Sequence, residues 1–119
     1  MTSSLWKKMI VACVVVTALA SGTTAFAQSF YRSDRVLAFD TDVWRVWVPA
    51  GSSRVVVDAG TQTDIDLEVY DETTGEMLAV DADRTSYCIG DFYKRRSGWI
   101  EIHVQNLGRF SNGYTLTVR

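Results

Sequence analysis

Histidine and cysteine are nearly absent from this chain, which has one histidine and two cysteines in 119 residues. Nucleophilic catalysis needs a nucleophile, a base and an orienting group that are held together. His103 and Cys88 lie on different predicted segments, and no G-x-S-x-G or H-E-x-x-H sequence occurs. We therefore expect no catalytic residues and no enzymatic activity.

No apolar run is long enough to cross a membrane, which takes about 20 residues. The longest run, Met9–Ala20, has 12 residues and is interrupted only by a threonine. Lys7 and Lys8 precede it, and Ala25-Phe26-Ala27 supplies the small-x-small pattern that a signal peptidase cuts after. We predict a cleaved signal peptide at residues 1–27 and a secreted or periplasmic mature protein at residues 28–119.

Two alternatives to cleavage remain for this segment. A retained membrane anchor would need a longer run, and the polar residues 21–24 follow this one directly. A lipoprotein would need a cysteine just after the run, whereas Cys13 lies inside it. We therefore expect no stable membrane insertion after cleavage.

Positive charge is also scarce. The predicted leader holds two lysines and no acid, so residues 28–119 carry ten Lys and Arg against fourteen Asp and Glu, a formal net charge of −4. A nucleic-acid or anionic-membrane binder would carry a basic excess. The one basic cluster, Lys94-Arg95-Arg96, is expected to be a solvated loop.

Cys88 is the only cysteine of residues 28–119, so no disulfide can form within that segment. The domain must therefore depend on its core, although small exported domains often rely on disulfides. We expect Cys88 to be a buried small hydrophobe. The alternative is a thiol that pairs between chains.

No part of residues 28–119 shows a sustained helical stripe, and apolar residues alternate with polar ones instead. This pattern predicts strands at Val36–Phe39, Asp42–Val48, Arg54–Ala59, Ile65–Asp71, Met77–Val80, Trp99–Gln105 and 114–118. Residues 81–97 are expected to be irregular. Seven to eight short strands with Gly-containing turns predict one all-β sandwich, formed by residues 42–119 after an N-terminal extension and first strand at residues 28–41.

Strand parity assigns a core face and an outer face to the two longest alternating segments. Trp44, Val46 and Val48 share the core face with Ile100 and Ile102. The candidate binding surface is the outer face, where aromatic rings and charges suit a sugar or a protein: Arg45, Trp47, Trp99 and His103. Alternatively, a loop containing Phe92 and Tyr93 covers the two tryptophans.

Acidic residues offer weak candidates for a calcium site, because calcium takes six to eight oxygen ligands and loops can supply them. These candidates are Asp64, Asp66, Asp81, Asp83 and Asp91. Their spacing does not match an EF-hand loop, so the prediction is that no metal or other cofactor is bound.

Five short motifs follow one another along residues 42–119. They are D-V-W-R-V-W-V-P-A-G at 42–51, D-I-D-L-E-V-Y-D at 64–71, G-E-M-L-A at 75–79, S-G-W-I-E-I-H-V at 97–104 and G-Y-T-L-T-V at 113–118. In order and spacing they resemble the bacterial pre-peptidase C-terminal domain family. The resemblance implies a jelly-roll-like β-sandwich without catalysis of its own, of a kind that trails secreted peptidases and in some relatives binds collagen or polysaccharide. Several relatives carry a cysteine pair near Cys88, whose partner is absent here.

The functional prediction is an exported, non-catalytic binding or accessory module. Its partner would be a polysaccharide, a matrix-like protein or a separately encoded secreted enzyme, and not a nucleic acid. A structural subunit of an exported complex is the alternative, and a small enzyme or enzyme inhibitor is less favoured.

Overall fold

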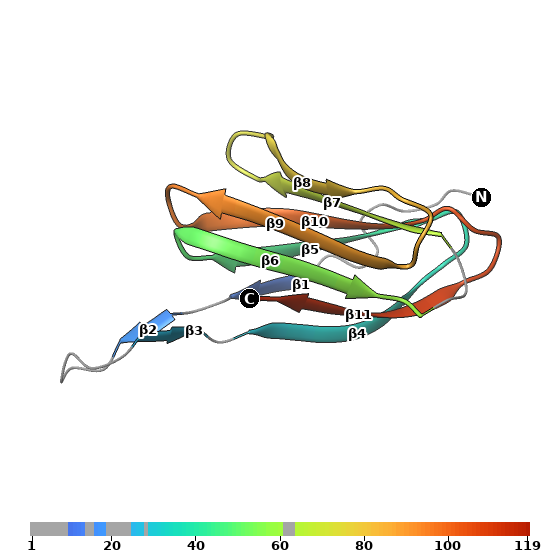
Figure 1. Cartoon of the computed structure of the whole chain (residues 1–119), viewed down its shortest axis with the longest axis horizontal. Coiled ribbons are helices and arrows are strands. Elements are labelled where there is room, and N and C mark those ends of the chain that lie inside the picture. Colours follow the sequence, from blue (N-terminus) through green and yellow to red (C-terminus); the bar gives the residue numbers. More distant parts are fainter. Residues whose placement is uncertain (1–9, 14–15, 19–24, 28, 61–63) are drawn as a thin grey trace.

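Two four-stranded antiparallel sheets pack face to face in the computed structural model, which describes residues 10–13, 16–18, 25–27, 29–60 and 64–119 (Figure 1). The first sheet has the order β5, β10, β7, β8, with bounds Thr41–Val48, Gly98–Asn106, Ile65–Asp71 and Met77–Asp81. The second has the order β4, β11, β6, β9, with bounds Phe30–Val36, Asn112–Val118, Gly51–Asp58 and Tyr87–Lys94. These eight strands confirm the predicted all-β sandwich.

Three short strands precede the sandwich, inside the predicted leader. β1 (Ile10–Cys13) pairs in parallel with β5 and extends the first sheet at its edge. β2 (Val16–Ala18) and β3 (Ala25–Ala27) pair antiparallel with each other. Cleavage after residue 27 would remove all three strands. The described residues include no helix that could span a membrane.

The core lies between the sheets and follows the predicted parity. Trp44, Val46 and Val48 of β5 are at most 1% exposed, as are Ile100 and Ile102 of β10. Facing them, β6 and β11 contribute a second apolar layer: Val55, Val57, Tyr114, Leu116 and Val118. Removing these side chains from water is the main force that holds the two sheets together.

Two predictions of secondary structure are wrong. The first strand is Phe30–Val36, not Val36–Phe39, and the chain turns at residues 38–39 before β5. Residues 81–97 are not irregular throughout, because β9 occupies Tyr87–Lys94 and pairs with β6 along its whole length. Both missed strands are at sheet edges of the eight-stranded sandwich, where one side of the strand is less constrained by neighbours.

Candidate functional site

The outer face of the first sheet carries the predicted binding residues, and we call it the aromatic face. Trp99 and Trp47 are directly opposite each other in the antiparallel register of β10 and β5. Both side chains lie on the outer side and are half-buried, as are Arg45 and His103. Opposed residues of an antiparallel pair lie about 5 Å apart at Cβ, so the two tryptophans are neighbours on this face, and we call them the aromatic platform.

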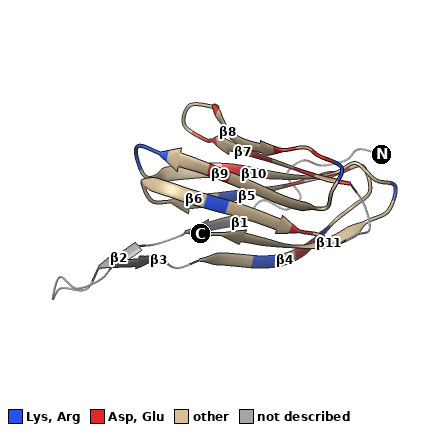
Figure 2. Cartoon of the chain, viewed as in Figure 1, with Lys and Arg blue, Asp and Glu red and all other residues tan. Residues whose placement is uncertain are grey.

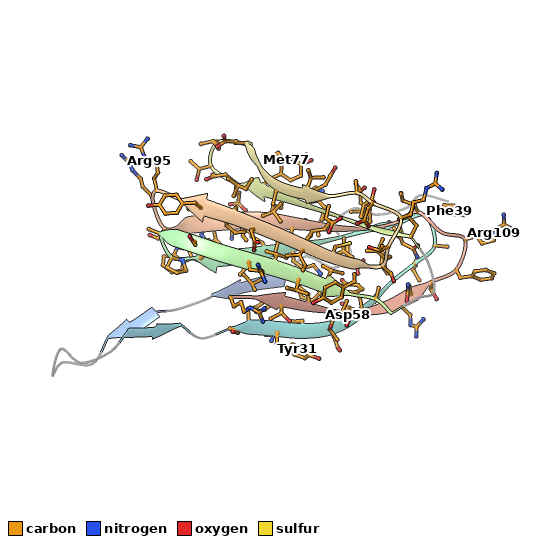
Figure 3. The ribbon with its side chains drawn as sticks, viewed as in Figure 1. Tyr31, Phe39, Asp58, Met77, Arg95 and Arg109 are labelled. Atoms are coloured by element: carbon orange, nitrogen blue, oxygen red, sulfur yellow. The ribbon has the colours of Figure 1, made fainter. Side chains whose placement is uncertain are left out.

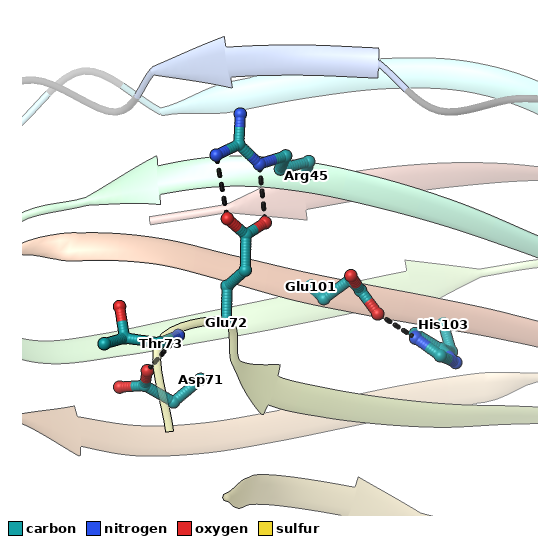
Figure 4. Close-up of polar contacts among 6 residues, drawn as sticks. All are labelled: Arg45, Asp71, Glu72, Thr73, Glu101 and His103. Atoms are coloured by element: carbon teal, nitrogen blue, oxygen red, sulfur yellow. Dashed lines mark hydrogen bonds and ion pairs between the residues drawn. The ribbon is translucent and has the colours of Figure 1, made fainter. Parts of the chain in front are cut away.

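Arg45 is held between this platform and a turn. Its guanidinium carbon lies 4.0 Å from the centre of the Trp99 ring. Its Nε and Nη2 donate to the two oxygens of Glu72, at 2.5 and 2.8 Å (Figure 4). The Glu72 hydrogen bond raises the pKa of Arg45, and the same bond lowers the pKa of Glu72. A ligand that stacks on this side of Trp99 therefore has to displace an arginine that is already paired.

His103 is the second polar centre of the face. Its Nε2 lies 2.8 Å from Oε1 of Glu101, and its ring centre lies 5.0 Å from that of Tyr70. The Tyr70 hydroxyl donates to Glu68 at 3.0 Å, and the pKa of Tyr70 is raised chiefly by partial burial. A shallow pocket opens beside these rings, lined by Tyr70, Asp71, Glu72, Gly75, Glu101 and His103.

The structure adds residues to the face that the sequence analysis did not name. Tyr70 and Glu68 belong to the outer side of β7, so the parity that identified Trp99 could also have identified them. Glu72 comes from the turn after β7, and no periodicity predicts where a turn residue points. Phe92 and Tyr93, which the alternative prediction places over the tryptophans, lie in β9 of the second sheet and pair with β6.

The basic cluster is not a uniformly solvated loop, which corrects the prediction for its first residue. Lys94 is only 7% exposed, and its Nζ donates to Oδ2 of Asp71 at 2.5 Å. This hydrogen bond is the main cause of a lowered pKa for Asp71. Arg95 and Arg96 are exposed at the turn, beside an open pocket that the β7–β8 turn also lines.

The fold separates Asp91 from the other calcium candidates, which lie near one another at the start of β7. Asp91 pairs with Arg54 across the second sheet, at 2.6 and 2.9 Å. Asp81 accepts a hydrogen bond from the backbone N–H of Ile89, and Asp83 accepts from Thr85. Asp66 is partly buried, and this burial, followed by the charge of Asp64, raises its pKa. Among the described residues, no group of three or more His, Cys, Asp or Glu could hold a metal ion.

Cys88 is buried in the core, as predicted, with an exposed fraction of 0%. Its Sγ lies 3.0 Å from the carbonyl oxygen of Ile65, and burial raises the pKa of the thiol to about 12. A thiol that is neutral and enclosed is a poor nucleophile. Pairing between chains through Cys88 would therefore require the sandwich to open.

A comparison with protein-family models matches residues 40–106 to the family described as bacterial pre-peptidase C-terminal domain. This range contains the six strands β5 to β10 and all four candidate residues of the aromatic face. A comparison with curated protein sequences finds no match.

Solved structures of the same fold support the family match. The pre-peptidase C-terminal domain of the Bacillus anthracis collagenase has a TM-score of 0.66 and 13% identity, over 94% of this chain and 93% of that chain. A periplasmic inhibitor of g-type lysozyme from Aeromonas hydrophila has a TM-score of 0.56 and 17% identity, over 93% and 96%. The corresponding inhibitor of Salmonella Typhimurium has a TM-score of 0.55 and 13% identity, over 94% of this chain and 96% of that chain. At these identities, the similarity concerns the fold.

Proposed function

Because this chain belongs to the bacterial pre-peptidase C-terminal domain family, we propose that it is an exported, non-catalytic module that binds a macromolecule outside the cytoplasm. The ligand class is a polysaccharide or an extracellular or periplasmic protein, which includes a secreted enzyme that the module accompanies. Family members are modules of secreted peptidases, so export and the absence of catalysis both agree with the family.

The observation that carries this proposal is the aromatic face. Two indoles stand side by side on an outer sheet face, and such rings stack well on sugars and on peptide side chains. Arg45 and His103 border them with polar side chains that Glu72 and Glu101 already orient. Oriented side chains lose less conformational freedom when a ligand binds, which favours recognition.

The experiment is a binding screen with the purified exported protein at micromolar concentration, on arrays of polysaccharides and extracellular matrix proteins. We expect Trp47→Ala and Trp99→Ala to weaken binding of the best ligand by about tenfold or more. Tyr31→Ala is the matched control, because Tyr31 is 56% exposed on β4 of the second sheet. Unchanged binding by both tryptophan variants would remove the aromatic face from the proposal.

A second candidate is inhibition of a secreted enzyme. It is favoured by the fold shared with periplasmic inhibitors of g-type lysozyme, over more than nine tenths of this chain and of each inhibitor. The test is hydrolysis of a peptidoglycan suspension by a purified g-type lysozyme, with increasing amounts of this protein. An unchanged rate at a tenfold molar excess would exclude inhibition of this lysozyme class.

A further inference from the structure

One end of the sandwich presents large apolar side chains to solvent. Leu37 and Phe39 lie on the turn between β4 and β5, and they are 50% and 71% exposed. Leu107 and Phe110 lie on the turn between β10 and β11, and they are 50% and 67% exposed. We call residues 37–40 and 107–111 the apex; Figure 3 labels Phe39 and Arg109 at this end. Scattered apolar residues are normal on a surface, but four on two adjoining loops form a patch.

The two loops of the apex are joined by hydrogen bonds. The N–H of Phe39 donates to the carbonyl of Gly108 at 3.1 Å. Asn106, which is 1% exposed, donates from Nδ2 to the carbonyl of Phe110 at 2.7 Å and accepts from the N–H of Gly108 at 2.9 Å. Its Nδ2 also reaches the carbonyl of Val36 at 3.4 Å, just before the other loop. The buried amide therefore fixes how the exposed side chains are presented.

Phe39 has an unfavourable backbone conformation. Its φ is 56°, and it is the only residue other than glycine with a positive φ in the described part of the chain. A bulky residue is strained in this region, where glycine or asparagine would fit at lower cost. The Phe39 side chain contributes little to the free energy of folding, because it is mostly exposed to water. Strain of this kind at an exposed position is typical of binding sites.

The charges around the apex favour a protein over a lipid surface. Arg109 is exposed and makes no hydrogen bond or ion pair with another described residue. β7 begins beside Asn106, and its start is surrounded by acids: Asp64, Asp66, Asp81 and Asp83 (Figure 2). These acids would be repelled by an anionic bilayer, whereas a protein pocket of limited width can accept the apolar loops without meeting them.

We propose that the apex is a protein-docking surface, and that its partner is an exported protein with a concave apolar pocket bordered by a carboxylate. Phe39 and Phe110 would enter the pocket, and Arg109 would pair with the carboxylate at its border. The proposal rests on the proposed binding function and specifies a protein as the ligand. It places the contact at the end of the sandwich, away from the aromatic face.

The experiment begins with photo-crosslinking in the bacterium that produces the protein. Benzoylphenylalanine replaces Phe39, Phe110, Trp47 or Tyr93 in four separate full-length chains. Tyr93 is the matched control, because it is 67% exposed but lies on β9 near the opposite end. We expect one protein to be linked from positions 39 and 110 and not from position 93, and mass spectrometry of the adduct identifies it.

The second step measures affinity with that purified protein. We expect Phe39→Gly and Phe110→Ala to weaken binding by about tenfold or more, with Tyr93→Ala within about twofold of the original. Phe39→Gly should fold at least as stably as the original chain, because glycine accepts the φ of 56°. The loss of affinity is then separate from any loss of structure.

Three results would overturn the proposal. The first is that no protein adduct forms at positions 39 and 110. The second is that the linked protein binds Phe39→Gly and Phe110→Ala as tightly as the original. The third is that position 39 links only to lipid, with binding to phosphatidylethanolamine–phosphatidylglycerol vesicles. An adduct from position 47 alone would exclude the apex as the docking surface and leave the proposed binding function intact. The absence of any adduct, together with no ligand on the arrays, would contradict both the apex and the proposed binding function.

Discussion

The indole Nε1 of Trp44 donates a hydrogen bond of 2.8 Å to the Tyr114 hydroxyl, deep between the two sheets. The hydroxyl in turn donates to Oδ2 of Asp42 at 2.7 Å. Trp44 and Asp42 belong to β5, and Tyr114 belongs to β11, so one polar chain links the first sheet to the second. Burial raises the pKa of Tyr114 far above its ordinary range, and the Asp42 carboxylate raises it further. The hydroxyl therefore keeps its proton and stays a donor.

We expect Tyr114→Phe to lower the free energy of unfolding by about 1–3 kcal/mol, because a buried acceptor for Trp44 and a donor to Asp42 are lost together. Urea denaturation followed by tryptophan fluorescence measures the change. Tyr31→Phe is the control, since Tyr31 is 56% exposed and should be close to neutral. Equal midpoints for the two variants would contradict the structural importance of this link.

Alternation was enough to predict the faces of β5 and β10, because nearly every second residue of these strands is large and apolar. β9 escaped prediction for a physical reason. Its inward residues are Cys88, Gly90, Phe92 and Lys94. They do not form the alternating pattern of large apolar residues that predicts a strand. Space at position 90 is tight, since a Cβ there would lie 3.0 Å from Cβ of Ala79 and one of the two would have to shift. Lys94 can point inward because its Nζ donates a hydrogen bond to Asp71 of the other sheet.

β4 was misplaced because only its two ends are buried. Phe30 and Val36 are 5% and 0% exposed, and the residues between them are mostly polar and accessible. The apex was not predicted at all, since exposed loop residues follow no period. The outer positions of Arg45, Trp47, Trp99 and His103 followed from parity, whereas the pairing of Arg45 with Glu72 depends on a turn that only the tertiary structure places.

The Lys94–Asp71 pair should stabilise the sandwich at neutral pH. Removing one partner of a buried pair costs up to about 3–5 kcal/mol, and Lys94→Met should approach the lower end because Asp71 retains hydrogen bonds from Thr73 and Thr74. Arg95→Met, at an exposed neighbouring position, is the control for the loss of one positive charge. Thermal unfolding at neutral pH distinguishes the two variants.

The same pair makes a prediction about pH. The folded pKa of Asp71 lies below its ordinary value of 3.8. The ionised Asp71 carboxylate therefore stabilises the fold above that value, and this stabilisation is lost as the pH falls through the lowered pKa. The difference in stability between the original chain and Lys94→Met should shrink in acid below pH 3.8. A difference that is constant between neutral pH and strong acid would show that Lys94 acts by packing alone.

Asp66 should behave in the opposite way. Its folded pKa lies above the ordinary 3.8, chiefly because it is partly buried. The ionised carboxylate therefore destabilises the fold above the raised pKa, and the penalty disappears as the pH falls toward 3.8. We expect Asp66→Asn to raise the thermal midpoint at neutral pH and to have little effect below pH 3.8. The control is Glu76→Gln on an exposed turn, and a lower midpoint for Asp66→Asn at neutral pH would contradict the expectation.

Arg45→Gln should uncover Trp99, because the guanidinium that lies 4.0 Å from its ring centre is removed. The expected result is stronger quenching of tryptophan fluorescence by acrylamide, with little change in the thermal midpoint. Arg54→Gln is a closely matched control. Arg54 makes the same bidentate contact with Asp91 in the second sheet, and no aromatic ring is stacked on it among the described residues. Equal quenching in both variants would show that Arg45 does not shield the indole.

The edge of β5 should respond to removal of the leader. β1 pairs with Trp44, Arg45, Val46 and Trp47 of this edge, and no other described strand occupies its place, because β10 pairs with the opposite side of β5. In a protein that begins at Gln28, the outward N–H groups of β5 would have only water as a partner. We therefore expect amide hydrogen exchange in β5 to be faster in residues 28–119 than in residues 1–119, while β7 and β10 exchange at equal rates in both.

Mass spectrometry of the exported protein should find Gln28 as its first residue. A product that keeps residues 10–13, with β5 protected as in the complete chain, would show instead that β1 is a permanent strand of the first sheet.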